Sequence, residues 1–555
     1  MTLKTTSAAR RSLPTIAWAL LAFTVLFWRL GATSFWDPDE AHYAQTTREL
    51  IASGDWLTPY YNEEPFFDKP IAFHLVQAIP MALAGPTEAA ARVVPALAAL
   101  AIVLWTWWLG QTLVSRQVGF MAALLLTANA AVFALARYAI LDTLFTAFLF
   151  GGVALIAVAA LKDRPRLQYG GYVLVAVATL IKGPLAPALC GLTLLAGTAV
   201  SPDVRRRLLR LRWMLGAAIV IVLSGPWFLV MLLRHGQAFV DGYVLKENLL
   251  LFSSQQYSGQ PPWWFYLQIL PVALLPWSGL ALGRLYDELR SVLRGGRLDT
   301  FEVLLWAWIA AIVGFFTLSQ FKLDHYVFPA APALCLLSAR AWTDLETLEG
   351  REHAGARIGA LVVGPVLVLA ALVIAFLMVD RFNLPRRALA MPAVIMALGF
   401  AVTVLSIRRP RLPAAPWLSA CAMGVLYAGV LLWVGPAFDE KKVVPDVARW
   451  VASHAGEGDR VAAYLLNRWN PAFRFYVGRH TTFLQGPDTA PNYFLQPEPF
   501  YAVMLEPAYK ELVARGIPLR VVYARDGMWV TSGRALWRQL ETPTRFVVVT
   551  RAEDH

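Results

Sequence analysis

The chain has few charged residues and few cysteines, and both shortages narrow the class of protein. Of its 555 residues, 15% are charged and 58% are hydrophobic. A soluble globular chain carries about a quarter charged residues, so this composition disfavours a soluble fold. Repeated apolar runs of about 20 residues instead indicate membrane spans. The sequence therefore predicts an α-helical protein that crosses a membrane many times.

The three cysteines, Cys190, Cys335 and Cys421, all fall inside apolar runs. This placement disfavours a disulfide framework, and no Cys/His spacing typical of structural zinc is present. The sequence also lacks an internal repeat of fixed period. That absence weakly disfavours transporter folds, many of which are built from inverted repeats.

The net charge of +12 would suit a nucleic-acid-binding protein. However, the basic residues stand in short clusters between apolar runs, as at 205–212 and 408–411. The excess of Lys and Arg in cytoplasmic loops of membrane proteins explains such clusters. We therefore expect membrane lipids, and no nucleic acid, among the partners.

Thirteen candidate spans can be drawn. Two of them are short and separated by Lys182-Gly183-Pro184, so a count of eleven or twelve stays open. The first run resembles a signal peptide, but it is long and no small-residue cleavage site follows it, so we expect an uncleaved span. The thirteen candidates lie at 13–30, 89–113, 118–135, 141–161, 169–181, 184–200, 213–233, 262–283, 301–318, 325–342, 358–379, 388–406 and 415–436.

The distribution of basic residues predicts a cytoplasmic N-terminus, because most basic clusters then fall on the cytoplasmic side. An odd number of spans places the C-terminus outside. One basic cluster, at 381–387, also falls outside. The same outer side collects most of the unusual polar positions, which are the loop 31–88, Asp142, Lys182, the loop 234–262 and the segment 322–326.

The composition changes after Pro436, where short runs rich in Val and Tyr alternate with helix-like stretches. This alternation predicts a small α/β domain. We expect residues 1–436 to form a transmembrane catalytic domain whose outer loops 31–88 and 234–262 roof the active site. We expect residues 437–555 to form a periplasmic domain that caps it. The expected strands are 459–466, 500–505, 518–523 and 545–550, and the expected helices are 444–455 and 506–515.

The stretch 36–70 collects eight carboxylates between two apolar runs. Asp39 and Glu40 begin a helix-like segment, so Asp39 is either a helix N-cap or a functional carboxylate, and the two roles are compatible. Glu49, Asp55 and Glu63 fit a solvated surface.

Asp142 stands where the fourth span begins, accompanied by Arg137 and Tyr138. A carboxylate at a span end is costly unless it is paired or faces water, so it is a functional candidate. The alternative is again an N-cap.

Three lysines stand at the predicted outer surface. Lys69 follows Asp68 and could bind a phosphate as a point charge, or merely neutralise its neighbour. Lys182 lies between two short spans, where it could instead be an interfacial snorkel. The segment from Lys322 through His325 and Tyr326 fits either interfacial anchoring or binding of a phosphate or sugar hydroxyl.

The loop 234–262 carries Arg234 and Lys246, which could hold an anionic head group. His42, His74 and His325 lie beside carboxylates, but no two of them have the spacing of a metal site. The pattern leaves a divalent-cation site open.

The motifs WDPDEAHYA, RELIASGDW, FFDKP, RYAILD, LIKGP and FKLDHYVFP together resemble those of the lipid-phosphate-sugar glycosyltransferases of the GT-C fold. Among these, the sequence is most similar to the bacterial aminoarabinose transferases that modify lipid A. The resemblance runs from about residue 30 to residue 340. The Asp-Glu pair specifies only the superfamily, whereas the DKP element is narrower. Related sequences often carry Glu-His and His-x-x-Pro where this chain has Glu247-Asn248 and Gly259-Gln260-Pro261-Pro262.

The resemblance implies a donor of undecaprenyl-phosphate-linked 4-amino-4-deoxy-L-arabinose and an acceptor phosphate on lipid A. It also implies an inner-membrane enzyme that acts on the periplasmic side, inverts the sugar linkage and gives resistance to polymyxin. We expect a monomer, for which the pattern requires no cofactor but leaves a divalent cation open. On this basis we expect three groups of site residues. The expected catalytic residues are Asp39, Asp142 and Glu40. The expected phosphate-binding residues are Lys69, Lys182, Arg137, Lys322 and Tyr326. The expected substrate-positioning residues are Tyr43, Asp68, Arg234, Lys246 and His325.

Two other functions fit parts of the pattern. Another GT-C enzyme, such as a protein O-mannosyltransferase-like protein, would share the Asp-Glu pair but differ in its acceptor. A lipid or solute transporter would carry charged residues at mid-membrane along a path, whereas here they stand at span ends on one face.

Overall fold

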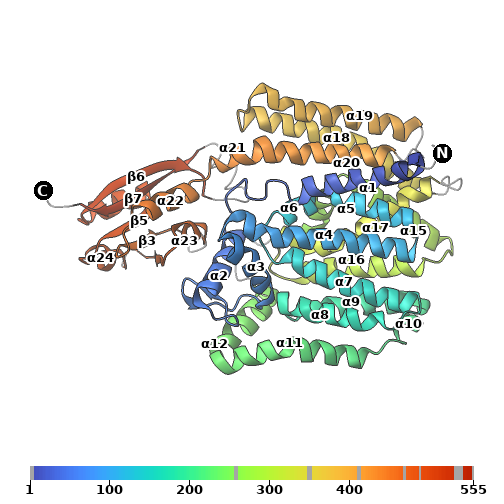
Figure 1. The fold of residues 1–555 in the computed structure, drawn as a ribbon, viewed down its shortest axis with the longest axis horizontal. Helices are drawn as coiled ribbons and strands as arrows, with labels where there is room; N and C mark the ends of the chain where they lie inside the picture. Colours follow the sequence, from blue (N-terminus) through green and yellow to red (C-terminus); the bar gives the residue numbers. More distant parts are fainter. Residues whose placement is uncertain are drawn as a thin grey trace.

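The computed structural model shows a large helical part and a small sheet at its C-terminal end (Figure 1). In Figure 1 the long helices lie side by side, and the sheet stands at one end of them together with α2, α3 and α12. We call this end of the helical part the sheet end. The structure describes residues 5–254, 261–346, 353–408, 414–466, 471–486, 489–529 and 542–552.

The helical part runs from α1 to α21 and includes short π and 3-10 segments, labelled η. The first eleven helices are α1 (Thr5–Leu26), α2 (Asp39–Ser53), α3 (Ala72–Ala84), α4 (Glu88–Leu113), α5 (Arg116–Thr127), α6 (Ala130–Ala136), α7 (Asp142–Leu161), α8 (Leu167–Lys182), α9 (Leu185–Val200), α10 (Pro202–Leu208) and α11 (Trp213–His235). The others are α12 (Gln237–Phe239), η1 (Val240–Leu250), α13 (Leu251–Ser253), α14 (Phe265–Ala273), α15 (Ser278–Leu293), α16 (Thr300–Leu318), η2 (Asp324–Ala330), α17 (Ala331–Leu345), α18 (Ala354–Asp380), η3 (Arg386–Leu389), α19 (Ala390–Arg408), α20 (Ala414–Gly429), η4 (Val430–Val434) and α21 (Gly435–Asp439).

Within the described residues, seven helices are long and apolar enough to cross a membrane, and two bent pairs raise the number to nine if each pair is one span. The protein is therefore a multi-pass membrane protein. The bent pairs are α5 with α6, at 61°, and α14 with α15, at 116°. Asn129 starts α6 by accepting bonds from the backbone of Ala131 and Val132, which explains the first bend.

The count of thirteen spans is not reproduced as thirteen long helices. The first candidate and the two separated by Lys182-Gly183-Pro184 are shorter apolar helices, and the candidate 325–342 divides into the 3-10 turn η2 and the 15-residue helix α17. Conversely, α3 is an apolar helix inside a stretch predicted as loop. Apolar composition alone does not reveal where a run breaks, because a break depends on capping and tertiary contacts.

Small residues bring the central helices close together. A Cβ placed on Gly110 of α4 would lie 2.8 Å from the Cα of Gly119 of α5, so only glycine fits this approach. Close backbone packing of this kind holds membrane helices together. Moving apolar surface out of lipid contributes little free energy, because the lipid tails are themselves apolar. The α4–α5 contact belongs to one large buried cluster that also includes α7 and α17.

The C-terminal sheet has five strands in the order β4-β3-β5-β7-β6. Strand β3 pairs parallel with β4 and β5, whereas β7 pairs antiparallel with β5 and β6. The predicted strands and both predicted helices are present, whereas β4, α23 and α24 were not predicted because they are short. The elements are α22 (Val444–His454), β3 (Arg460–Tyr464), α23 (Pro471–Val477), β4 (Thr482–Leu484), α24 (Thr489–Phe494), β5 (Phe500–Leu505), α25 (Glu506–Ala514), β6 (Leu519–Gly527) and β7 (Thr544–Arg551).

Helix α23 packs against α2 and joins the sheet to the helical part. Arg474 contacts Glu49 at 3.3 Å and Glu63 at 3.2 Å, and Arg48 donates to the carbonyl of Phe475 at 2.7 Å. Glu49 also accepts bonds from the backbone amides of the hairpin formed by β1 (Tyr60–Tyr61) and β2 (Glu64–Pro65). The interpretation of Glu49 as solvated surface was therefore wrong, because the sheet and this hairpin bury it.

Candidate active site

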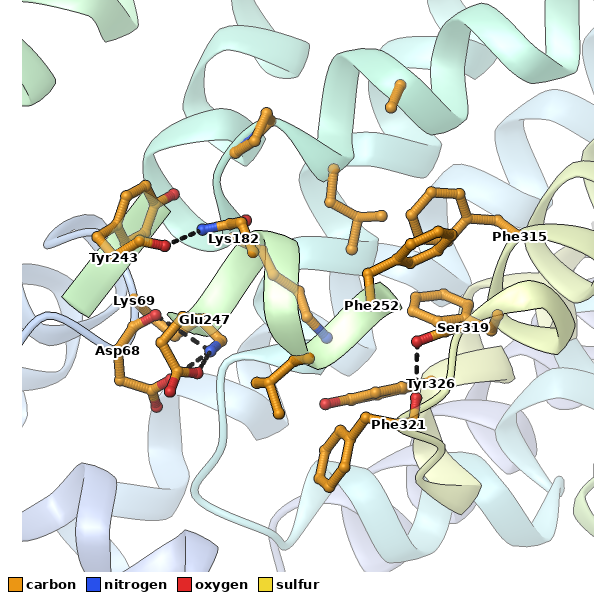
Figure 2. Close-up of a pocket in the computed structure, with 16 residues that line it drawn as sticks. Asp68, Lys69, Lys182, Tyr243, Glu247, Phe252, Phe315, Ser319, Phe321 and Tyr326 are labelled. Atoms are coloured by element: carbon orange, nitrogen blue, oxygen red, sulfur yellow. Dashed lines mark hydrogen bonds and ion pairs between the residues drawn. The ribbon is translucent and has the colours of Figure 1, made fainter. Parts of the chain in front are cut away.

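A cavity of about 310 Å³ opens between the C-terminal end of α8, η1, the C-terminal end of α16 and the turn η2. One side of it is polar and the other is apolar. Figure 2 shows Asp68, Lys69 and Glu247 together at one side and Phe252 and Phe315 at the other. The polar lining residues are Asp68, Lys69, Lys182, Tyr243, Glu247, Asn248, Ser319 and Tyr326. The main apolar ones are Leu185, Leu251, Phe252, Phe315 and Phe316.

Lys69 lies between two carboxylates at the polar side. Its ammonium forms an ion pair with Asp68 and lies 3.4 Å from Glu247 Oε2. Burial acts to raise the pKa of Asp68, but Lys69 holds it below its usual range. Burial and the neighbouring Asp68 charge raise the pKa of Glu247 to about 8. At neutral pH the cluster therefore holds an ionised Asp68, an ionised Lys69 and a protonated Glu247.

A second charged cluster joins three elements that are distant in sequence. Lys182, the last residue of α8, forms an ion pair with Asp142, the first residue of α7. Both positions suit the charge, because a helix N-terminus favours an anion and a C-terminus favours a cation. The ammonium of Lys182 lies 4.6 Å from the ring centre of Tyr326, and His325 Nε2 lies 3.7 Å from Asp142 Oδ2.

The turn after Lys182 requires glycine. Gly183 has φ +76°, and a Cβ at this position would collide with the hydroxyl of Tyr243, which lines the same cavity. A side chain there is excluded by both the backbone conformation and the space. The LIKGP motif therefore has a local structural reason: it ends α8 sharply and leaves Lys182 at the cavity.

Asp39 begins α2 but does not cap it. The N-cap position is Pro38, and no side-chain capping bond is made. Among the described residues Asp39 has no hydrogen-bond or ion-pair partner, although His325, Asp68, Asp142 and Lys69 all act on it electrostatically. Burial raises its pKa above the usual value. Asp142 likewise makes no capping bond, so the capping alternative accounts for neither carboxylate.

Glu40, predicted as catalytic, lies behind the cavity in a fully buried ion pair. Its oxygens accept from Arg92 Nε at 2.6 Å and Nη2 at 2.8 Å. They also accept from the backbone amides of Trp36 and Ala139, each at 3.0 Å. With no exposed surface, its carboxylate cannot reach a substrate in this structure, so the geometry assigns it a structural role.

The other predicted residues divide into those near the cavity and those away from it. Tyr43 lines a small void behind Asp68 and Lys69. Lys322 bonds the carbonyl of Ser319, a residue that lines the main cavity, but does not itself line it.

Three predicted cationic residues lie away from the cavity. Arg137 donates to the carbonyls of Val25, near the end of α1, and Trp28, just after it. Arg234 pairs with Asp55 at 3.2 Å on an exposed surface, and Lys246 is exposed on the outer side of η1. Spacing along the chain could not separate these from Lys69 and Lys182, since all five are single basic residues near span ends.

Sequence reasoning did not select Glu247, Asn248 or the aromatic wall. The sequence offered one signal, since Glu247-Asn248 is where the motifs depart from related sequences. The other half of that departure, at Gly259 and Gln260, lies outside the described residues. Within the described residues, no group of three His, Cys, Asp or Glu side chains is arranged to hold a metal ion.

Both the sequence and the fold of the chain are similar to those of known proteins. Residues 68–229 match the model of the family described as dolichyl-phosphate-mannose-protein mannosyltransferase. The chain is 29% identical over 333 residues to the undecaprenyl phosphate-alpha-4-amino-4-deoxy-L-arabinose arabinosyl transferase of Edwardsiella ictaluri, covering 59% of this chain and 58% of that protein. It is also 29% identical over 348 residues to the enzyme of the same name from Aeromonas hydrophila, covering 61% of each chain. These alignments thus span about three fifths of the curated relatives.

The fold of the chain agrees with that of a solved structure over nearly its whole length. The crystal structure of ArnT from Cupriavidus metallidurans bound to undecaprenyl phosphate superposes with a TM-score of 0.77 and 22% identity, covering 98% of this chain and 100% of that one. The resemblance predicted from the motifs is therefore confirmed: this chain is similar in sequence to the bacterial undecaprenyl phosphate-aminoarabinose arabinosyl transferases and has the GT-C fold.

Proposed function

We propose that this protein is an inner-membrane glycosyltransferase that moves 4-amino-4-deoxy-L-arabinose from undecaprenyl phosphate to a phosphate of lipid A. The observation that carries the proposal is the cavity itself, which places Lys69 at one side, an aromatic wall at the other and Lys182 between them. A lipid phosphate has the same division into a charged head and an apolar tail. The names of the curated relatives and the lipid in the ArnT structure support the choice of donor.

Lys69 suits the phosphate of the donor. Its contact with Glu247, at 3.4 Å, is long for a hydrogen bond, so a phosphate oxygen can take that place. A protonated Glu247 adds no negative charge to repel the phosphate, and its O–H can donate to it. Lys182 lines the same cavity and supplies the second cation. The polyprenyl chain would then run along the wall formed by Phe252, Phe315 and Phe316.

The reaction needs one bond to break and one to form. The bond between the sugar C1 and the phosphate oxygen breaks, and undecaprenyl phosphate leaves with the electron pair. An oxygen of the acceptor forms the new bond to C1. Lys69 and Lys182 stabilise the negative charge that gathers on the departing phosphate, which is a role for preorganised cations. Attack from the opposite face to the leaving group would invert the sugar linkage.

A phosphate acceptor changes what Asp39 must do. A phosphate on lipid A is already anionic, so it needs little deprotonation, whereas a hydroxyl acceptor would need a base. We assign Asp39 and Asp142 to holding the sugar, including its ammonium group, in line with the acceptor. Asp39 suits this task because no described residue occupies its oxygens.

One observation favours a second candidate. The family model that matches residues 68–229 is described by a mannosyltransferase that acts on proteins. A protein O-mannosyltransferase-like enzyme would use the same cavity for a lipid-phosphate mannose and would use Asp39 as the base for a hydroxyl. The two candidates differ in the sugar transferred and in the acceptor.

Transfer by purified protein tests the proposal. The full chain is reconstituted in proteoliposomes with undecaprenyl-phosphate aminoarabinose and lipid A, and the products are separated by mass spectrometry. The proposal expects a pentosamine on lipid A with the wild type and none with Asp39→Asn. Equal transfer by both would refute the role of Asp39, and transfer to a peptide hydroxyl but not to lipid A would favour the second candidate.

Sidedness is part of the proposal. The cavity, α2 and the sheet share one end of the helical part, which we assign to the periplasm on the basis of the basic loops elsewhere. A monomer contains the whole cavity.

A further inference from the structure

The segment that leads to Asp39 has no regular secondary structure before α2 begins, yet side chains accept from the backbone amides of Ser34, Phe35 and Trp36. Ser34 N donates to Asp439 Oδ1 at 3.0 Å, and Phe35 N donates to the hydroxyl of Tyr476 at 2.9 Å. Trp36 N donates to Glu40 at 3.0 Å. Because a buried backbone group without a partner is costly, these side chains determine the path of the segment.

Lys442 is the central element of this arrangement. Its ammonium donates to the carbonyl of Ser34 at 3.1 Å, to Ser34 Oγ at 3.2 Å and to the carbonyl of Phe35 at 3.3 Å. It lies 3.2 Å from Asp439 and 4.2 Å from the ring centre of Trp36. Only 4% of Lys442 is exposed.

A buried lysine is an expensive way to stabilise a fold. Desolvation of the two charges can exceed the gain from their attraction, so a buried ion pair is weak evidence for stability. Its best-supported use is to fix one geometry among several. Here the geometry that it fixes is that of Ser34 and Phe35, five and four residues before Asp39.

The region beyond residue 436 holds this segment at one further point and is itself anchored at two others. The backbone amide of Ala472, in α23, donates to Asp37 Oδ1 at 2.8 Å. The hydroxyl of Tyr476 also donates to Glu88 at 2.7 Å, which ties the segment to the start of α4. The backbone amide of Met528, the residue after β6, donates to the carbonyl of Lys441, and the carbonyl of Met528 accepts from the amide of Val443. These bonds join the linker that carries Lys442 to the sheet.

We propose that the C-terminal α/β region positions Asp39, and that Lys442 and Tyr476 are its positioning residues. This inference rests on the proposed function of Asp39. Neither residue lines the cavity, so each acts through the backbone of Ser34–Trp36. The region is thereby part of the catalytic machinery and not only a cover over the membrane part.

The test uses the full chain and near-isosteric variants. Lys442→Met removes the ammonium, and Tyr476→Phe removes one hydroxyl. Lys441→Met is the matched control, because the adjacent Lys441 donates only to the carbonyl of Arg381, away from the segment. Turnover is followed as release of undecaprenyl phosphate from the donor, per folded molecule as judged by size-exclusion chromatography.

We expect Lys442→Met to lower kcat by about 10- to 100-fold, as a misplaced catalytic group does, with the donor KM unchanged within about two-fold. Tyr476→Phe should lower kcat less, and Lys441→Met should not change it. A purely structural role would instead reduce the yield of folded protein and leave kcat per folded molecule unchanged, which would overturn the proposal.

Hydrogen–deuterium exchange separates this inference from the proposed function. We expect faster exchange in residues 34–42 for Lys442→Met and no change for Lys441→Met. Unchanged exchange in Lys442→Met overturns the inference even if the wild type is an active transferase. Faster exchange supports the inference even if the wild type fails to release undecaprenyl phosphate, which would refute the proposed function alone.

Discussion

Asp39 and Glu40 are adjacent carboxylates for which the structure predicts opposite consequences on substitution. Glu40 accepts four hydrogen bonds, two from Arg92 and two from backbone amides, and has no exposed surface. Glu40→Gln keeps the shape but removes the charge. It leaves the Arg92 guanidinium buried without its carboxylate. It also places the NH₂ group of Gln where an oxygen of Glu40 accepts from N–H donors. Breaking a buried pair in this way costs about 3–5 kcal/mol of unfolding free energy.

Asp39→Asn should have the reverse profile. Burial raises the pKa of Asp39, so the folded state binds the proton more tightly than the unfolded state. Its contribution to stability is therefore greatest below pH 3.8, the ordinary value, and is lost as the pH rises toward the folded pKa. At neutral pH the charge is a net cost, so a neutral Asn should leave stability unchanged or raise it slightly, while transfer is lost.

Denaturant unfolding in micelles and turnover per folded molecule measure both profiles. We expect a stable, inactive Asp39→Asn and a destabilised Glu40→Gln. Glu40→Gln with wild-type stability would refute the structural assignment of Glu40. A large loss of stability in Asp39→Asn would refute the view that its oxygens are kept for a substrate.

Three further predictions follow from the cavity and its surroundings. Lys69→Met should weaken binding of undecaprenyl phosphate by about 10- to 100-fold, which corresponds to about 1.4–3 kcal/mol for a lost charged hydrogen bond. Native mass spectrometry or fluorescence titration measures this change in affinity. The pKa of Glu247 is about 8, so this side chain becomes a carboxylate as the pH is raised through 8. Because the new charge repels the phosphate, the Kd for undecaprenyl phosphate should rise over this range. Glu247→Gln should remove this pH dependence. Arg137→Gln should lower the unfolding free energy by about 1–3 kcal/mol without changing turnover, since Arg137 contacts the carbonyls of Val25 and Trp28 and the ring of Phe133, away from the cavity. A selective loss of donor affinity would instead place it at the phosphate.

Much of the fold could be predicted from composition and pattern. The alternation of Val- and Tyr-rich runs with helical stretches located β3, β5, β6 and β7, because strand periodicity is a local property. The short elements β4 and α23 were not predicted, because a segment of three to seven residues is too short to show a detectable periodicity. The bends between α5 and α6 and between α14 and α15 were not predicted, because hydropathy carries no information on the direction of a helix axis.

The site could be predicted only in part. Lys69, Lys182 and Tyr326 were identified because a charge or an aromatic residue stands out against an apolar chain, and the three indeed line one cavity. Glu40 was assigned to the chemistry because its partner Arg92 lies 52 residues away and carries no local signal. Glu247 was missed because its altered pKa arises from Asp68 and burial, both of which depend on tertiary structure.

The most direct test of the account is the lipid A of cells that lack their own aminoarabinose transferase but make the undecaprenyl-phosphate-linked donor. Mass spectrometry compares lipid A from cells carrying this chain, its Asp39→Asn variant or an empty vector. The account predicts a pentosamine on lipid A only with the wild-type chain. Unmodified lipid A in cells that contain the folded wild-type protein would contradict it.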